Sequence, residues 1–409
     1  MFPKTLLTTL LLALSVAANP VLVDRAPVSV SFSRRVNATS VQHLVRHDQA
    51  RAKYLKQKGA AKAAGLEDAV INFPVENQAV SYIASIGVGS PATTYNLIVD
   101  TGSSNTWVGA GTEYVETSTS TQTSNSVYVS YGSGSFSGIE YTDTVTIGSS
   151  LTITEQSIGV ASSSTGFDSV DGILGIGPLD LTEGTLSPDY SSTIPTVTDN
   201  LFFQGIISAH SIGISFEPSQ TGADLNGEIT WGGVYSSKYT GSITYIPVTS
   251  TSPANEYWGI NQSIKYGTST TILSSTAGIV DTGTTLILIA TNGFNKYKSA
   301  TGATLDNNTG LLAISSANFN KLSSLFFTTG GTTFELTANA QIWPRALNND
   351  IGGTASKIYL ITSDLGSNSG EGLDFINGQS FLERFYSVFD TANNRVGLAT
   401  TPFTKATSN

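Results

Sequence analysis

Apolar residues after position 73 fall into short runs that alternate with polar residues or stop at glycine. Residues 82–88 alternate, turn at Gly89-Ser90-Pro91 and resume over 95–99, which predicts a pair of strands. Residues 128–131 and 136–147 flank a glycine-punctuated turn and predict a β-hairpin. The same patterns predict the remaining elements: strands over 206–216, 228–232 and 241–248, a Ser/Thr-rich surface loop over 117–126, and short helices over 293–299 and 318–326.

The N-terminus has a different pattern. Residues 1–18 combine Lys4, a Leu-rich core over 6–14 and small residues at 16–18, which is typical of a secretory signal peptide. A membrane anchor is the alternative, but this apolar run is too short to span a bilayer. We therefore expect a secreted protein, with routing to an acidic vacuole as the alternative destination, and no membrane partner.

Residues 19–68, called the leader below, are basic and partly helical in pattern. Residues 41–46 and 50–58 predict helix, followed by a flexible junction over 59–65 that suits proteolytic cleavage. We expect the mature protein to begin within 59–72.

Composition predicts a mostly β protein. Charged residues make up only 12% of the chain, about half the usual share. The 40 glycines and the many Ser and Thr residues favour short strands and turns over long helices. Because 409 residues exceed what one hydrophobic core usually holds, we expect two lobes, over 69–250 and 251–409.

Cysteine and histidine content excludes several chemistries. The chain has no cysteine, so disulfides, a thiol nucleophile and thiolate metal sites are all absent. Of the three histidines, His43 and His47 lie in the leader, where we expect them to be exposed on a helix; the alternative is that they assist release of the leader by gaining charge as the pH falls. A Ser-His-Asp hydrolase or a multi-histidine metal site would therefore depend on His210 alone, and we expect neither a metal nor a cofactor.

Charge is divided unevenly along the chain. Residues 1–68 carry ten Lys or Arg and four acidic residues, which leaves ten basic and 26 acidic residues in the remainder. A basic leader on an acidic body suggests a masking segment held by charge attraction. The alternative, a basic arm that binds nucleic acid, conflicts with the secretory signal, so we expect no nucleic-acid partner.

One phrase occurs twice. Residues 98–104 and 279–285 each run Ile-Val-Asp-Thr-Gly into two hydroxyl residues, 181 positions apart. Each copy is followed by a short apolar segment that ends in glycine, at residues 173–175 after the first copy and 375–378 after the second. Two comparable lobes, each ending a strand in such a loop, predict an active site at the lobe interface.

Asp100 and Asp281 are the candidate catalytic residues. Two adjacent carboxyls cannot both ionise easily, so one stays protonated while the other acts as a base, and the pair can activate water for peptide hydrolysis. Glycine permits close backbone approach, and a hydroxyl can orient a carboxylate or bond across the lobe interface. The residues expected to orient the pair are Thr101, Gly102, Ser103, Thr282, Gly283 and Thr284.

These motifs resemble those of the pepsin family of aspartic endopeptidases, and within it the polyporopepsin-type secreted fungal proteases. The resemblance covers about residues 78–400. Residues 100–108 resemble the first catalytic loop, and residues 131–138 resemble the flap, a hairpin that closes over substrate. Residues 171–175 and 388–399 resemble scaffold phrases of the family.

The resemblance implies a bilobal pepsin-like fold in which two pseudo-two-fold-related β lobes enclose the active-site cleft. It implies that Tyr131 packs on the substrate while its hydroxyl bonds Trp107, and that Gly132 and Ser133 bond the substrate chain. It also implies a self-activating zymogen whose leader is an intramolecular inhibitor. The mature enzyme is then expected to be a monomer that cleaves proteins and peptides at acidic pH, with apolar residues flanking the cut.

Two features depart from the family pattern or add to it. Asn377 stands where the family commonly has Leu before the glycine, and the sequence alone does not explain it. Asn261 and Asn307 each begin an Asn-x-Ser/Thr glycosylation pattern.

Two other functions fit parts of the sequence. A non-catalytic relative that captures proteins would usually lack a catalytic Asp or the flap residue, and this chain has both. An extracellular β sandwich that binds carbohydrate would leave the duplicated Asp loops unexplained.

Overall fold

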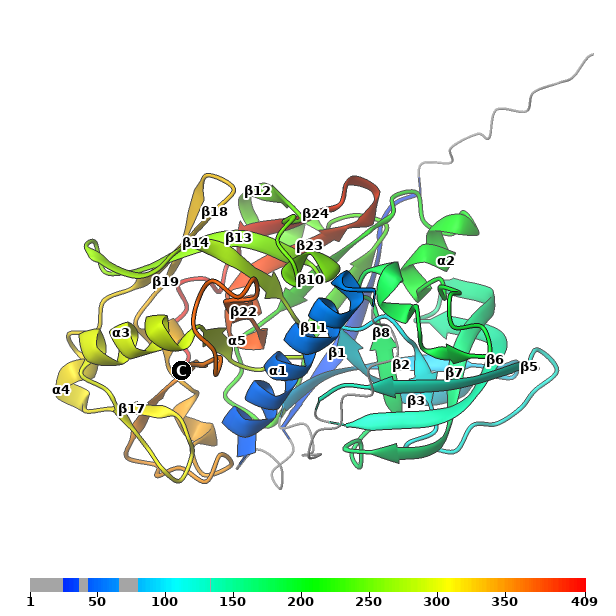
Figure 1. Ribbon diagram of the computed structural model, residues 1–409, viewed down its shortest axis with the longest axis horizontal. Helices are drawn as coiled ribbons and strands as arrows, with labels where there is room; N and C mark the ends of the chain where they lie inside the picture. Colours follow the sequence, from blue (N-terminus) through cyan, green and yellow to red (C-terminus); the bar gives the residue numbers. More distant parts are fainter. Residues whose placement is uncertain (1–24, 37–42, 66–79, 133) are drawn as a thin grey trace, which may run out of the picture.

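The computed structural model describes residues 25–36, 43–65, 80–132 and 134–409. Within these residues the strands form three sheets, of 14, seven and three strands. The seven-stranded sheet lies on one side of helix α1 (Leu44–Ala63), and part of the 14-stranded sheet lies on the other (Figure 1). The expected mostly β, two-lobed architecture is therefore observed.

The large sheet draws on both ends of the chain. In sheet order its strands are β12 (Thr240–Pro247), β24 (Arg395–Thr400), β23 (Phe385–Asp390), β10 (Ser211–Phe216), β11 (Ala223–Trp231), β1 (Val28–Val36), β2 (Val80–Val88), β3 (Thr93–Asp100), β8 (Gly172–Gly175), β4 (Trp107–Val108), β7 (Leu151–Thr165), β6 (Ser135–Ile147), β5 (Thr121–Ser130) and β9 (Leu186–Ser187).

The other two sheets belong to the second half of the chain. The seven-stranded sheet runs β19 (Thr332–Leu336), β18 (Leu325–Thr329), β13 (Gly259–Tyr266), β14 (Thr270–Val280), β22 (Phe375–Asn377), β15 (Ile287–Ile289) and β21 (Thr362–Asp364). The small sheet runs β16 (Thr304–Leu305), β17 (Leu312–Ile314) and β20 (Ile358–Leu360).

Besides α1, the helices are short. They are α2 (Val197–Phe203), α3 (Thr291–Thr301), α4 (Ser316–Phe319) and α5 (Gln379–Leu382). None of the helices in the described part of the chain has the length and apolar character needed to cross a membrane.

The strands that lead into the two Asp loops are buried at their ends. β3 begins with partly exposed residues and finishes as Leu-Ile-Val-Asp, all buried, and β14 likewise ends in buried residues. Each pairs with a short parallel strand, β3 with β8 and β14 with β22. A strand covered on both faces is expected to be continuously apolar, and the ends of β3 and β14 have this pattern. Both are therefore central strands, and each leads from the interior of its sheet into one of the two Asp loops.

The described parts of residues 25–65, called the N-terminal segment below, are integral to the fold. β1 pairs antiparallel with both β11 and β2, so it is an interior strand of the large sheet. Helix α1 lies between the two lobes (Figure 1), and its Leu44, Ala52 and Leu55 are buried. The N-terminal segment thus buries apolar side chains against the rest of the chain, and this burial stabilises the contact between them.

Several sequence expectations need correction. The two helical stretches expected at 41–46 and 50–58 belong to one helix from Leu44 onward, with residues 41 and 42 outside the described residues, and the expected junction at 59–65 is helical as far as Ala63. The expected surface loop at 117–126 already belongs to β5 from Thr121, because this strand pairs with β6 from that residue onward. The helix expected over 318–326 ends at Phe319, and β18 begins at Leu325.

Candidate active site

Asp100 and Asp281 meet at the bottom of the space between the lobes. Asp100 is the last residue of β3, and Asp281 follows directly after β14. Their side chains are 1% and 0% exposed. The two halves of the chain, 181 residues apart at this point, therefore bring both candidate carboxylates into one buried site, called the dyad below.

Threonine side chains join the two loops. The backbone N–H of Thr101 donates to Thr282 Oγ1 at 3.0 Å, and the N–H of Thr282 donates to Thr101 Oγ1 at the same distance. Each hydroxyl also donates to the facing strand, Thr282 to the carbonyl of Val99 at 2.9 Å and Thr101 to that of Val280 at 3.4 Å. The reciprocal bonds fix the two loops relative to each other.

Each carboxylate is oriented by its own loop. Ser103 Oγ donates to Asp100 Oδ2 at 2.5 Å, and Thr284 Oγ1 donates to Asp281 Oδ2 at 2.6 Å. The N–H groups two residues after each Asp donate to the Oδ1 atoms, at 2.9 Å and 3.0 Å. The two arrangements match atom for atom, as the repeated sequence predicts.

The glycines of the two motifs are required by close approach. A Cβ on Gly102 would lie 2.7 Å from Asp281 Oδ1, and one on Gly283 would lie 2.6 Å from Asp100 Oδ1. Any side chain here would separate the carboxylates.

Arg51 of α1 binds both carboxylates. Its Nη2 donates to Asp100 Oδ1 at 2.6 Å and to Asp281 Oδ1 at 2.9 Å, and its Nε donates to Asp281 Oδ2 at 2.8 Å. The guanidinium is 1% exposed and therefore fills the space between the carboxylates. Sequence reasoning predicted a basic masking segment but did not single out Arg51, because no local pattern separates it from the leader's other basic residues.

The two carboxyls have opposite pKa shifts. Burial raises the pKa of Asp100, and the Asp281 charge raises it further, although Arg51 opposes the shift. Burial also disfavours the charged form of Asp281, but the Arg51 charge and the hydrogen bonds from Arg51 and Thr284 outweigh it and lower its pKa. Asp281 is thus the carboxyl that ionises first, and Asp100 the one that retains a proton.

Further contacts hold α1 in the cleft. The Asp48 carboxylate accepts the backbone N–H groups of Thr285 and Leu286 at 3.1 Å and 2.7 Å, directly after the second Asp loop. Tyr257 donates its hydroxyl to the backbone carbonyl of Leu55 at 2.8 Å. Lys62 pairs with Glu183 of the first lobe at 3.1 Å. The helix therefore contacts both lobes on either side of the dyad.

The two leader histidines differ. His43 is exposed as expected, but His47 is 1% exposed, and its Nδ1 lies 3.2 Å from Asp48 Oδ1. The expectation of an exposed His47 is wrong because α1 turns this face of the helix toward the body.

The candidate flap lies over α1. Tyr131 follows β5, and its ring packs near Trp107, 6.5 Å between centroids, and edge-on to Phe167 at 5.6 Å. Burial raises the pKa of Tyr131 well above its usual range and the Trp107 side chain opposes this shift, so the Tyr131 hydroxyl and the Trp107 indole lie near each other.

Gly132, at φ 77°, approaches α1 so closely that a Cβ would lie 2.6 Å from Tyr54 Cβ. Ser133, the other expected flap residue, lies outside the described residues. The tip of the hairpin therefore rests on the helix that occupies the cleft.

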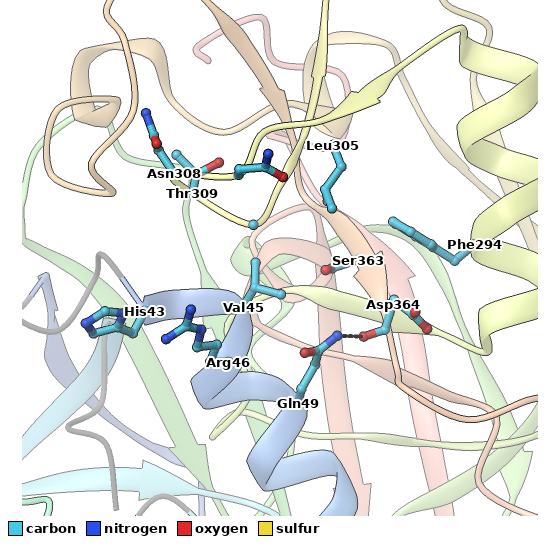
Figure 2. A pocket seen from close by; sticks show the side chains of 12 residues that line it. His43, Val45, Arg46, Gln49, Phe294, Leu305, Asn308, Thr309, Ser363 and Asp364 are labelled. Atoms are coloured by element: carbon cyan, nitrogen blue, oxygen red, sulfur yellow. Dashed lines mark hydrogen bonds between the residues drawn. The ribbon is translucent and has the colours of Figure 1, made fainter.

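A cavity of about 350 Å³ remains beside the helix. Figure 2 shows it between the first turns of α1 and the second lobe, where Gln49 donates to the backbone carbonyl of Asp364 at 2.9 Å. Phe294 and Leu305 form part of the opposite wall. The N-terminal segment thus leaves open space beside the first turns of α1.

The remaining predicted residues lie on the surface. Asn261 in β13 and Asn307 in the turn after β16 are both exposed. In the described part of the chain, no group of three or more His, Cys, Asp or Glu side chains could hold a metal ion.

Comparisons with known proteins agree with this geometry. The family profile described as eukaryotic aspartyl protease matches residues 81–401. Polyporopepsin of Irpex lacteus is 70% identical over 336 residues, which are 82% of this chain and 98% of that protein. Pepsin A of Sus scrofa is 32% identical over 345 residues, covering 80% of this chain and 83% of that protein.

The fold also matches a solved structure. The crystal structure of the aspartic proteinase from Irpex lacteus superimposes with a TM-score of 0.81 at 61% identity, covering 94% of this chain and 100% of that one. The bilobal pepsin-like fold expected from the sequence is confirmed.

Proposed function

The chain belongs to the pepsin family of eukaryotic aspartyl proteases and is an aspartic-type endopeptidase, and we propose that it is secreted as an inactive zymogen that acid converts to the active enzyme. The observation that carries this proposal is the three-bond contact of Arg51 with Asp100 and Asp281. In the proposal, the N-terminal segment is the leader and the two carboxyls are the catalytic groups.

In the active enzyme the dyad would share one proton. Once Arg51 leaves, a water molecule between the two carboxyl groups loses a proton to the ionised member of the pair and attacks the scissile carbonyl. The protonated member of the pair donates its proton to the carbonyl oxygen, and the tetrahedral intermediate collapses when the leaving nitrogen receives a proton from the dyad. Aspartic proteases as a class use such a pair of carboxyls.

The leader blocks this chemistry by occupying the site. The Arg51 guanidinium pairs with both carboxyl groups and takes the space that the water needs. An arginine suits this position because its planar fork of donors can bond two carboxylates at once. Asp48 and Leu55 add contacts to the second lobe, so the substrate cleft is covered on both sides of the dyad.

Acid releases the leader in this scheme. The lowered pKa of Asp281 means that Arg51 contributes binding free energy above the ordinary carboxyl pKa of about 3.9. That contribution is lost as the pH falls through the lowered pKa, because a protonated carboxyl no longer attracts the guanidinium. The leader is therefore retained at neutral pH and weakened in acid.

β1 must also leave its sheet. Arg34 of this strand bonds Glu383 at 3.2 Å, and both side chains are buried. Removal of the leader thus exposes an interior sheet position as well as the dyad, so conversion is a rearrangement of the large sheet in addition to a release from the cleft.

We propose that the substrate binds in the cleft that the leader occupies in the precursor. Tyr131 and Gly132 of the flap would close over an extended peptide, whose main chain supplies most hydrogen bonds. Such binding favours broad specificity with apolar residues around the cut. We further propose that the enzyme is a monomer, that it is extracellular rather than vacuolar, and that Asn261 and Asn307 carry glycans.

One assay tests the proposal. The purified full chain is acidified, N-terminal sequencing follows loss of the leader, and cleavage of a protein substrate is measured with and without a statine inhibitor. Self-processing and inhibitable cleavage are expected from the wild type and not from Asp100→Ala. A correctly processed protein without inhibitable cleavage would contradict the proposed catalytic role of the dyad, and a precursor that stays full-length in acid would contradict self-activation.

A further inference from the structure

Asn377 lies immediately behind the second Asp loop. It ends β22, where it pairs with Val280 of β14, and its backbone carbonyl accepts the N–H of Asp281 at 3.2 Å. The next residues continue this support, since Gln379 donates its N–H to Thr284 and its side-chain amide to Thr282, both at 2.8 Å. The position of β22 therefore sets the position of the Asp281 loop.

The Asn377 side chain has one specific partner. Asn377 Nδ2 donates to Gln262 Oε1 at 3.0 Å, and Gln262 Nε2 donates to Asn377 Oδ1 at 3.3 Å. Both side chains are 0% exposed. In the sheet order β13, β14, β22, these two bonds join the strands on either side of β14, the strand that carries Asp281.

The first lobe lacks this pair. The Asp-Thr-Gly repeat places residue 276 of β14 at the position of Tyr95 in β3, and Val280 at that of Val99. The strand partner of Tyr95 is Ile86, where Thr276 has Gln262, and the partner of Val99 is Leu174, where Val280 has Asn377. The two amides therefore replace two buried apolar residues together.

Stability does not explain this replacement. A buried amide costs free energy unless it is hydrogen-bonded, and an apolar pair of similar volume is often no less stable. Ile86 and Leu174 show that the fold accepts such a pair at the equivalent site. The amides add a geometric constraint. Two reciprocal hydrogen bonds fix one position of β22 relative to β13, whereas apolar contacts would tolerate several.

We propose that Gln262 and Asn377 form a positioning pair for the Asp281 loop, holding β22 so that the Asp281 carboxylate keeps its separation from Asp100. The inference rests on the proposed catalytic role of Asp281. The charged groups that face this carboxylate are Asp100 and, until the leader leaves, Arg51. The separation of the two carboxylates determines how strongly they share a proton, so a shift of the loop alters kcat and its pH dependence together.

The test uses near-isosteric variants of the full chain, Gln262→Met, Asn377→Leu and the double variant. Each is acid-processed, or processed with added protease where it does not self-convert, and its active sites are titrated with a statine inhibitor. Each single variant leaves one amide unpaired, so it lowers both the melting temperature and kcat. The double variant regains the melting temperature but keeps a loss in kcat of about 10-fold, with KM within about twofold and both limbs of the kcat–pH profile moved.

Two controls make the outcome decisive. Gln341→Leu removes another buried amide of the same half, one that bonds Tyr297 and backbone carbonyls away from the dyad, and it is expected to lower stability with kcat intact. Wild-type kcat and pH profile in the folded double variant, or an equal kcat loss in Gln341→Leu, would overturn the positioning role. Asp281→Asn is measured in parallel, and if it retains activity, the proposed catalytic dyad fails rather than this pair alone.

Discussion

Asp100 and Asp281 have matching loops but unequal surroundings. Each has one hydroxyl donor and one backbone donor, yet Arg51 gives two hydrogen bonds to Asp281 and one to Asp100. At Asp281 the effect of Arg51 outweighs that of burial and lowers the pKa, whereas at Asp100 burial and the Asp281 charge raise the pKa against the opposing effect of Arg51. The single residue Arg51 thus breaks the symmetry that the repeated sequence builds.

Replacing either carboxyl is expected to abolish catalysis. Asp100→Asn and Asp281→Asn should each lower kcat by about 10³-fold, because one shared proton needs both groups. The double variant should be little worse than either single, since the two act as one unit. Turnover is measured after the leader is removed by an added protease, with the half-buried Asp350→Asn as control. A folded single variant with near-full activity would contradict the shared-proton mechanism.

Removing the blocking cation should ease activation. Arg51→Gln abolishes the interaction that lowers the pKa of Asp281, so the leader should be lost at a pH about one unit higher than in the wild type. Arg51→Lys keeps the charge but not the fork of donors and should fall between the two. The measurement is the half-conversion pH on gels, with the exposed Arg46→Gln as control on the same helix. An unchanged half-conversion pH in Arg51→Gln would show that other contacts hold the leader.

At the scale of elements, α1 covers the dyad because its buried face packs against both lobes. Gly59 is buried where the helix crosses the second lobe, and a Cβ there would lie 2.8 Å from Pro253 Cβ and 3.1 Å from the Tyr257 ring. The expected flexible junction was wrong at this point, because the glycine serves close helix packing rather than chain flexibility.

A larger residue at 59 should lift the helix from the cleft. Gly59→Leu adds good helix propensity but forces contacts below van der Waals distance, so conversion in acid should be several-fold faster. Ala63→Leu, on an exposed position of the last turn, provides the matched control. Conversion is followed by the rate of leader loss at fixed pH, and equal rates for the two variants would show that this contact does not hold the leader.

The accuracy of sequence prediction differed between elements for physical reasons. The two Asp loops were predictable because Asp-Thr-Gly and its preceding apolar strand are contiguous in sequence. Arg51 was not, because its role depends on where a helix docks 49 residues before Asp100 and 230 before Asp281. Asn377 was noticed as unusual, but its partner Gln262 is defined only by strand register.

For the whole molecule, the N-terminal segment joins the two lobes that the dyad needs to keep together. β1 is built into the large sheet, α1 contacts both lobes, and the Thr101–Thr282 bonds lie beneath. No disulfide assists, since the chain has no cysteine. In the proposed zymogen, loss of the leader would therefore change the stability of the molecule as well as its activity.

Stability should depend on pH differently before and after processing. The raised pKa of Asp100 means that its protonated form stabilises the fold below the ordinary carboxyl pKa of about 3.9, and that this contribution is lost as the pH rises through the raised value. In the precursor, the positive charge of Arg51 offsets the second negative charge, which forms when Asp100 ionises beside Asp281. In the processed enzyme both buried carboxylates would ionise without that cation, so the melting temperature should fall toward neutral pH by about 3 °C or more relative to the precursor.

Calorimetry across the acidic to neutral range measures this difference. Processed Asp100→Asn separates the two possible causes, because it removes the second charge while the leader is still lost. Its melting temperature should stay nearly level toward neutral pH if repulsion within the dyad is responsible. If it falls as steeply as the processed wild type, the vacated position of β1 in the large sheet, with Glu383 left without Arg34, is the cause instead.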